Sequence, residues 1–220
     1  MIDNYEMDQT KTETAQFQAV DIEAGGTIVS RKDANKAIST GFRTLDITYI
    51  AIFAVIIAVC SWISIPTFVP FTLQTFGVFL AVAVLGGKRG TLSVLIYLLL
   101  GIVGVPVFAE FTSGMGILLG STGGYIVGFV FSALLMWAME RILGKKRWVL
   151  SLSMVLGLNV LYAFGTVWFM VVYGRDVETI GVWTALGWCV FPYIIPDLVK
   201  IALALTIYKK LARAIKIDEA

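Results

Sequence analysis

The sequence predicts an all-α integral membrane protein, a bundle of six transmembrane helices with both termini in the cytoplasm. Of its 220 residues, 58% are hydrophobic and only 15% are charged, and the mean hydropathy is +0.86. These values lie outside the usual range of soluble domains. A spanning helix needs about 20 apolar residues, and the chain offers six apolar runs joined by short, often basic links. The runs are Leu45–Ile65, Leu73–Leu85, Leu92–Val105, Tyr125–Ile142, Val149–Tyr173 and Val182–Tyr208.

Residues 1–44 are predicted to form a polar cytosolic tail without a fold of its own. This stretch holds no long apolar run, and its composition is typical of disordered segments. It also lacks the early positive charge and apolar core of a secretory signal. Residues 45–211 are predicted to form the transmembrane domain, and residues 212–220 a second, short cytosolic tail.

The second and third runs are short for an upright span of about 30 Å at about 1.5 Å per residue. Their ends are therefore expected to lean on neighbouring protein or to continue into structured loops. In membrane proteins, short runs interrupted by glycine or proline point toward a binding site.

The basic residues predict the orientation. All 17 lysines and arginines except Arg175 and Lys200 precede the first run, lie in the second–third link, lie at the end of the fourth run or in the link after it, or follow the end of the sixth run. By the positive-inside rule that side is the cytoplasm. Five or seven spans would put the two termini on opposite faces and spoil this pattern.

The sixth run carries two ionisable residues, Asp197 and Lys200, within apolar sequence. Counted back from Lys209 at the inner end, they lie roughly 18 and 13 Å deep at about 1.5 Å per residue. An ionisable side chain at that depth costs on the order of 3 kcal/mol, so each is expected to face the bundle interior and to have a partner. Their i, i+3 spacing places them on one helical face, where they can neutralise each other.

Two prolines in the same run, Pro192 and Pro196, remove backbone donors. The helix is therefore expected to break or kink there and to free carbonyls for a ligand. The pair is either a polar clamp for a ligand or a structural ion pair. The coincidence of the pair with the proline break favours the clamp.

The outer link between the third and fourth runs, residues 105–125, is glycine-rich yet apolar, and Glu110 is its one charged residue. A solvated loop would carry more charge, so the link is predicted to pack into the bundle mouth as a lid or re-entrant segment. Close helix packing is the alternative, and both can hold in different halves. The helix-packing alternative rests on small residues that recur every four positions, namely Gly116, Gly120, Gly124, Gly128 and Ser132.

The first outer link, residues 65–75, is uncharged and contains two prolines, so it could cap an outward-facing pocket. Gln74 lies near the end of this link, and its amide both donates and accepts hydrogen bonds. It is either a ligand contact or a polar residue at a helix start.

Small side chains mark one face of the first run. They are Ala51, Ala54, Ala58 and Ser61. Small residues in this register let another helix approach closely. The sequence leaves open whether that helix belongs to this chain or to a different subunit.

The chain contains no histidine, which excludes His-based catalytic triads, HExxH metalloproteases and His-ligated metals or haem. The glycine-rich turn at residues 86–91 lacks the spacing of a phosphate-binding loop, so the chain is not expected to hydrolyse ATP. Cys60 and Cys189 lie in apolar runs as small hydrophobes. The net charge of +2 gives no indication of a nucleic-acid partner. We therefore predict no catalytic residue, metal or cofactor.

Six blocks of sequence carry a family resemblance across Leu45–Leu211. The blocks are Val69–Thr75, Leu85–Gly90, Tyr97–Gly101, Gly104–Phe108, Gly123–Tyr125 and Pro196–Lys200. In this order they resemble the BioY family, the substrate-capture subunits of biotin transporters. The long N-terminal tail departs from the family pattern, and no function is carried onto it.

The resemblance implies six helices around a nearly occluded biotin pocket that opens outward. It also implies an Ala-x-x-x-Ala face on the first helix, matched by Ala54 and Ala58, which docks on an energising module. That module comprises a transmembrane coupling (T) protein and two ATPases, which makes the chain the S component of an energy-coupling-factor (ECF) transporter in a bacterial plasma membrane. The predicted ligand-binding residues are Asp197, Lys200, Gln74, Tyr125, Gly124 and Tyr193.

Biotin has a neutral ureido head and a carboxylate tail. Asp197 can accept from a ureido N–H while Lys200 donates to the ureido carbonyl. A carboxylate facing Asp197 would instead oppose like charges at low dielectric. The alternatives are a proton-coupled secondary transporter with Asp197 and Lys200 as a relay, a capture subunit for another vitamin, and, least favoured, a membrane enzyme.

Overall fold

The computed structural model describes residues 22–24, 27–29, 44–67 and 69–214. The chain divides into two units, residues 1–47 and 48–220. In the first unit, β1 (Ile22–Ala24) pairs antiparallel with β2 (Thr27–Val29). The rest of the tail before residue 44, and the end of the chain after residue 214, lie outside the described residues, so the two cytosolic tails stay predictions.

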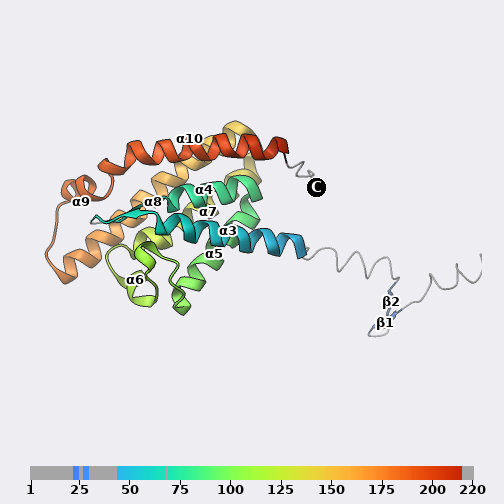
Figure 1. Ribbon diagram of the computed structural model, residues 1–220, viewed down its shortest axis with the longest axis horizontal. Coiled ribbons are helices and arrows are strands. Elements are labelled where there is room, and N and C mark those ends of the chain that lie inside the picture. Colours follow the sequence, from blue (N-terminus) through green and yellow to red (C-terminus); the bar gives the residue numbers. More distant parts are fainter. Residues whose placement is uncertain (1–21, 25–26, 30–43, 68, 215–220) are drawn as a thin grey trace, which may run out of the picture. The chain divides into compact units, whose positions relative to one another are not determined.

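Helices form most of the described part of the second unit (Figure 1). The long ones are α3 (Thr44–Trp62), which begins in the first unit, α4 (Gln74–Leu85), α5 (Gly87–Val103), α7 (Gly123–Leu143), α8 (Arg147–Asp176) and α10 (Phe191–Ala214). The short ones are η1 (Ala109–Phe111), α6 (Met115–Leu119) and α9 (Val182–Cys189). A small antiparallel pair, β3 (Ser64–Ile65) with β4 (Phe71–Thr72), lies between α3 and α4.

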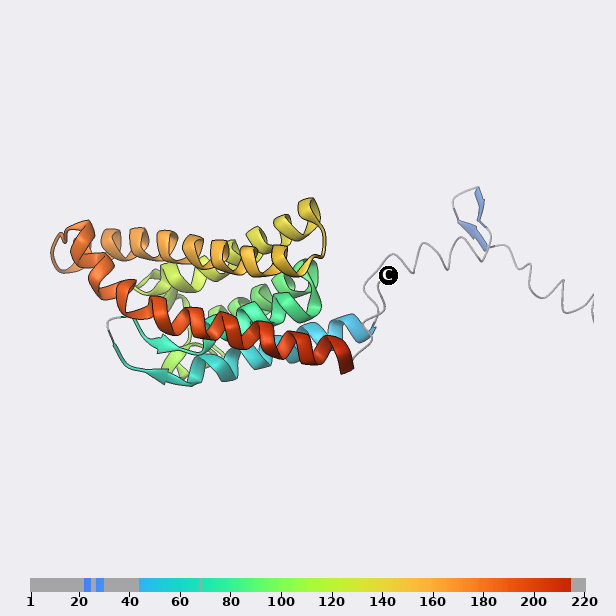
Figure 2. The ribbon, with the colours of Figure 1, turned by 90° about the horizontal axis from the view of Figure 1, so that it is seen from above.

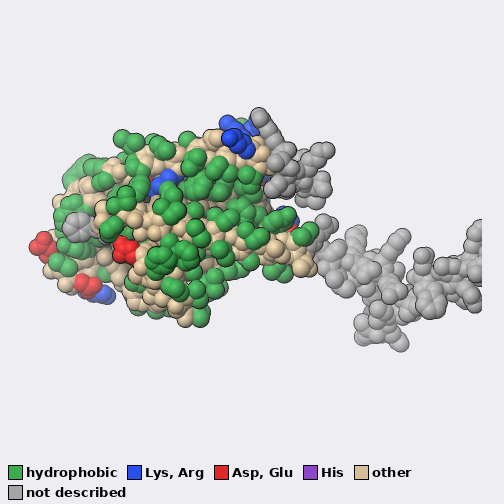
Figure 3. Space-filling view, viewed as in Figure 1, with side chains coloured by type: hydrophobic (Ala, Val, Ile, Leu, Met, Phe, Trp, Pro, Cys, Tyr) green, Lys and Arg blue, Asp and Glu red, His purple; other side chains and the backbone are tan. Residues whose placement is uncertain are grey.

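Four of the described helices are long and apolar enough to cross a membrane, namely α3, α7, α8 and the Phe191–Leu211 part of α10. The predicted apolar helical bundle is thus confirmed in outline, as a multi-pass membrane protein. Helix α4 is shorter, with 12 residues, and α5 has 17. Hydrophobic side chains dominate the face shown in Figure 3, as expected where lipid is the solvent.

Helix α4 lies in the core, as its burial shows. Ten of its 12 residues are buried, from Gln74 to Val84 with Phe76 excepted. It packs against α5, α7 and α10. A side chain at Gly90 of α5 would collide with the backbone of Val82, so this glycine is what permits the close α4–α5 approach. A helix so enclosed needs no lipid-spanning length of its own, because most of its side chains meet neighbouring helices and not lipid.

The link between α4 and α5 is a single glycine, Gly86, at φ 79°. This left-handed conformation favours glycine. The carboxylate of Glu140, near the end of α7, accepts a hydrogen bond from the Gly87 N–H. It therefore satisfies one of the unpaired donors at the start of α5.

Helices α7 and α8 run side by side in both ribbon views (Figures 1 and 2). Small residues make this contact possible. A side chain added at Gly124 would collide with Trp168, one at Gly128 would touch Leu161, and one at Gly157 would meet the Ser132 hydroxyl. The α7 half of the four-residue repeat therefore serves helix packing, whereas a side chain at Gly116 would meet nothing within 4 Å.

Two predicted boundaries are corrected. The first helix ends at Trp62, before the predicted Ile65, because Ser64 and Ile65 pair with β4. The sixth run is split at Val190 into α9 and α10. Pro192 lies in the first turn of α10, where its missing N–H costs little. The predicted break does not fall at Pro196, through which α10 continues.

Candidate functional site

A cavity of about 250 Å³ lies in the second unit. Its walls come from the β4–α4 segment, the link that contains η1, α6, the start of α7, the middle of α8, and α9–α10. Small-molecule pockets typically measure about 300 to 1,000 Å³. The cavity is therefore sized for one compact ligand.

Asp197 and Lys200 of α10 meet in this cavity. Lys200 Nζ lies 2.7 Å from Asp197 Oδ1, and the residues are 4% and 5% exposed. The predicted interior pair therefore forms within one helical face, as its i, i+3 spacing requires. Since both residues line the cavity, the pair is buried yet within reach of a ligand.

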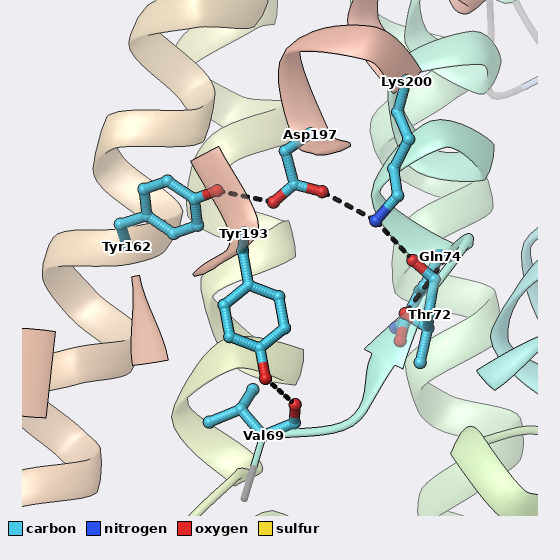
Figure 4. A network of polar contacts seen from close by, with 7 residues as sticks. All are labelled: Val69, Thr72, Gln74, Tyr162, Tyr193, Asp197 and Lys200. Atoms are coloured by element: carbon cyan, nitrogen blue, oxygen red, sulfur yellow. Dashed lines mark hydrogen bonds and ion pairs between the residues drawn. The ribbon is translucent and has the colours of Figure 1, made fainter. Parts of the chain in front are cut away.

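Lys200 also binds the link between α3 and α4. Its Nζ donates to the Thr72 carbonyl at 2.6 Å (Figure 4). It also lies 4.0 Å from the centre of the Phe71 ring. The ring face attracts the ammonium group. Of the three N–H donors of Lys200, two are used by described residues, so one remains for a ligand.

The second oxygen of Asp197 accepts from Tyr162, whose hydroxyl lies 2.6 Å from Asp197 Oδ2 (Figure 4). Tyr162 comes from α8 and lines the cavity, and the sequence analysis missed it. The available signal was a tyrosine in the middle of an apolar run, because a buried tyrosine hydroxyl usually has a partner. Its hydrogen bond fixes the orientation of the carboxylate.

Gln74 begins α4 and lines the cavity. Its Nε2 donates to the Tyr97 hydroxyl at 3.0 Å, and the residue is 4% exposed. The Thr72 hydroxyl accepts from the Gln74 backbone N–H at 3.2 Å. Gln74 is thus held in place on two sides, with an amide oxygen that can accept from a ligand.

Two tyrosines supply aromatic walls. The Tyr193 hydroxyl donates to the Val69 carbonyl at 2.5 Å, and its ring stacks on Phe71 with centroids 5.9 Å apart. The Tyr125 hydroxyl lies 3.0 Å from the Thr166 hydroxyl. Both tyrosines line the cavity, so their rings are available to an apolar part of a ligand.

The remaining predicted residues lie elsewhere. Gly124 is not among the cavity-lining residues and faces Trp168, so its contact with a ligand stays a prediction. Ala54 and Ala58 are 2% and 5% exposed and belong to the hydrophobic core. These methyl groups pack inside the chain, and the docking of this face on another subunit stays a prediction. Among the described residues, no group of three His, Cys, Asp or Glu side chains could hold a metal ion.

The model of the BioY family matches residues 32–217. This chain belongs to the BioY family. A member from Thermotoga maritima, "Biotin transporter BioY", is 41% identical over 163 residues, 74% of this chain and 92% of the relative. The "Probable biotin transporter BioY" of Pyrococcus horikoshii is 41% identical over 77% of this chain and 97% of its own length. BioY relatives are transporters, and the prediction that the chain is not an enzyme is confirmed.

A solved structure supports the same assignment. The crystal structure of the S-component for biotin from an ECF-type ABC transporter superposes on this BioY chain with a TM-score of 0.68. The two are 25% identical, and the match covers 81% of this chain and 93% of the other. The bundle is therefore the fold of an ECF S-component.

Proposed function

We propose that the chain captures biotin outside a bacterial plasma membrane as the S component of an ECF transporter. Its partners in this role are a transmembrane T protein and two ATPases, which energise uptake. The named relatives and the superposed S-component support this proposal. The observation that carries it is the neutralised Asp197–Lys200 pair at a cavity that also has aromatic walls.

The cavity chemistry suits biotin. A ureido head needs an acceptor for its N–H groups and a donor for its carbonyl, and Asp197 and Lys200 supply one of each. Because the pair is neutral as a whole, a neutral head can bind without leaving a charge unpaired. Tyr125, Tyr193 and Phe108 then offer apolar surface to the tetrahydrothiophene ring and the aliphatic chain.

The proposed topology has six spans, with α4 and α5 counted as spans, and both termini in the cytoplasm. It keeps the basic residues around α5, α7 and α8 on the inner side, in keeping with the positive-inside rule. The cavity then opens outward, because the α3–α4 link, η1 and α6 lie at the opposite ends of these helices.

External labelling tests this topology. In a variant without Cys60 and Cys189, a membrane-impermeant thiol reagent applied to intact cells is expected to label Arg175→Cys and not Lys146→Cys. Lys146 lies in the link directly before α8, and Arg175 lies near the other end of the helix. Both positions are exposed, so they are matched in accessibility. Labelling of Lys146→Cys in intact cells would contradict the six-span arrangement.

Uptake tests the role as a capture subunit. In cells that lack their own biotin transporter, the chain together with its T protein and ATPases is expected to accumulate labelled biotin. An ATPase variant that cannot hydrolyse ATP should abolish this accumulation. If the chain alone accumulates biotin and an uncoupler abolishes it, the proton-coupled alternative is correct.

A further inference from the structure

A turn with unfavourable backbone geometry forms part of the cavity wall. Ala109 and Glu110 of η1 line the cavity together with Phe108 and Thr112. Glu110 and Phe111 adopt φ values of 57° and 58°. Left-handed backbone costs roughly 1 to 2 kcal/mol for each residue that has a side chain. Such a conformation persists only where surrounding contacts impose it.

The last residues of α3 supply those contacts. The Ser61 hydroxyl lies 2.5 Å from the Val107 carbonyl and 2.7 Å from the Ala58 carbonyl of its own helix, so these two acceptors share its one proton. The Trp62 indole N–H donates to the Pro106 carbonyl at 2.9 Å. The Trp62 ring also stacks on Phe111, with centroids 5.0 Å apart. The end of α3 thus contacts the turn just before its cavity-lining residues and again at Phe111, which lies among them.

The same end of α3 holds a second part of the wall. The chain leaves α3 directly into β3, which pairs with β4, and the Leu73 N–H donates to the Ile63 carbonyl at 3.1 Å. Thr72 in β4 lines the cavity and accepts from Lys200. Two parts of the cavity wall that are far apart in sequence, the 106–112 turn and β4, are therefore both held by the end of α3.

We propose that Ser61 and Trp62 form a latch that holds the 106–112 turn over the cavity and sets how often the cavity opens. They are positioning residues, since neither lines the cavity. The proposal rests on the proposed function only for the identity of the ligand. Releasing the latch lets the strained turn relax outward, so a small molecule enters and leaves faster, while the Asp197–Lys200 pair is unchanged.

The chain contains its own reporter of opening. Cys189 lines the cavity and is 1% exposed, so a thiol reagent reaches it only when the cavity opens. In full-length chain with Cys60→Ala, Trp62→Phe removes the indole donor but keeps an aromatic ring. The labelling rate of Cys189 is expected to rise about fivefold, the factor that corresponds to about 1 kcal/mol for one hydrogen bond. Ser61→Ala should give a similar increase, and Trp62→Ala a larger one because stacking is also lost.

Trp168→Phe is the matched control. The Trp168 indole N–H donates at 3.0 Å to the carbonyl of Gly120, which belongs to the same outer link but does not line the cavity. This variant should leave the Cys189 rate within about twofold of the parent. Equal acceleration in Trp168→Phe, or no acceleration in the three latch variants, would overturn the latch.

Cys60 distinguishes opening from local unfolding. It is buried beside Gly77 at the end of α3 and does not line the cavity. In a Cys189→Ala background, the latch variants should leave Cys60 labelling unchanged, and equal acceleration there would mean that α3 itself has unfolded. Protection of Cys189 by added biotin tests the proposed function separately, because the latch predicts the rates without ligand.

Discussion

Asp197→Asn and Lys200→Met are each expected to weaken biotin binding about 100-fold, or about 2.7 kcal/mol. Each change removes a proposed ligand hydrogen bond and also leaves the other member of a buried pair without its partner, a penalty of roughly 3 to 5 kcal/mol. Calorimetry on purified variants measures the binding loss, and thermal melting measures the loss of stability. Lys209→Met, an exposed lysine on the same helix, is the control and should bind as the parent does.

The double variant separates ligand contact from scaffold. Asp197→Asn combined with Lys200→Met removes the charge imbalance, so thermal stability should recover while binding should not. Tyr162→Phe should fall between parent and single variants, since it loses one hydrogen bond to Asp197 and leaves the ion pair intact. A double variant that binds nearly as well as the parent would make the pair structural.

Ala58→Trp is expected to destabilise the folded chain. Ala58 is 5% exposed in the core, and inserting large side chains into packed interiors costs typically about 1 to 3 kcal/mol or more. Ala51→Trp is the control, because Ala51 lies on the same helix and is exposed. Size-exclusion profiles and melting curves compare the two variants.

The outcome also decides whether the small-residue face of α3 packs against its own chain or against another subunit. If Ala58→Trp folds and binds biotin but fails in uptake, Ala58 meets a partner subunit and not the core of its own chain. The burial of Ala54 and Ser61 beside it predicts the opposite.

Composition and charge were enough to predict the helical membrane bundle, because lipid demands long apolar helices and basic residues mark one side. The depth of Asp197 and Lys200 predicted their burial and pairing, because hydrocarbon does not tolerate lone charges. The contact of Lys200 with Thr72 joins residues that are 128 positions apart, so no local pattern predicted it.

Other features were beyond the sequence for identifiable reasons. A stripe of small residues looks the same whether its partner helix lies inside the chain or in another subunit, so Ala54 and Ala58 could not be assigned. The left-handed turn at Glu110 and Phe111 carries no glycine to signal it. Tyr162 of α8 can bond Asp197 because α8 lies beside α10. The periodicity of the sequence does not determine which helices are neighbours.

Calorimetry of the purified wild-type chain with biotin tests the central claim most directly, with thiamine and riboflavin as comparison ligands. The proposed function predicts saturable binding of one biotin per chain and no measurable heat from the other two vitamins under the same conditions. Saturable binding of another vitamin, with no binding of biotin, would contradict it.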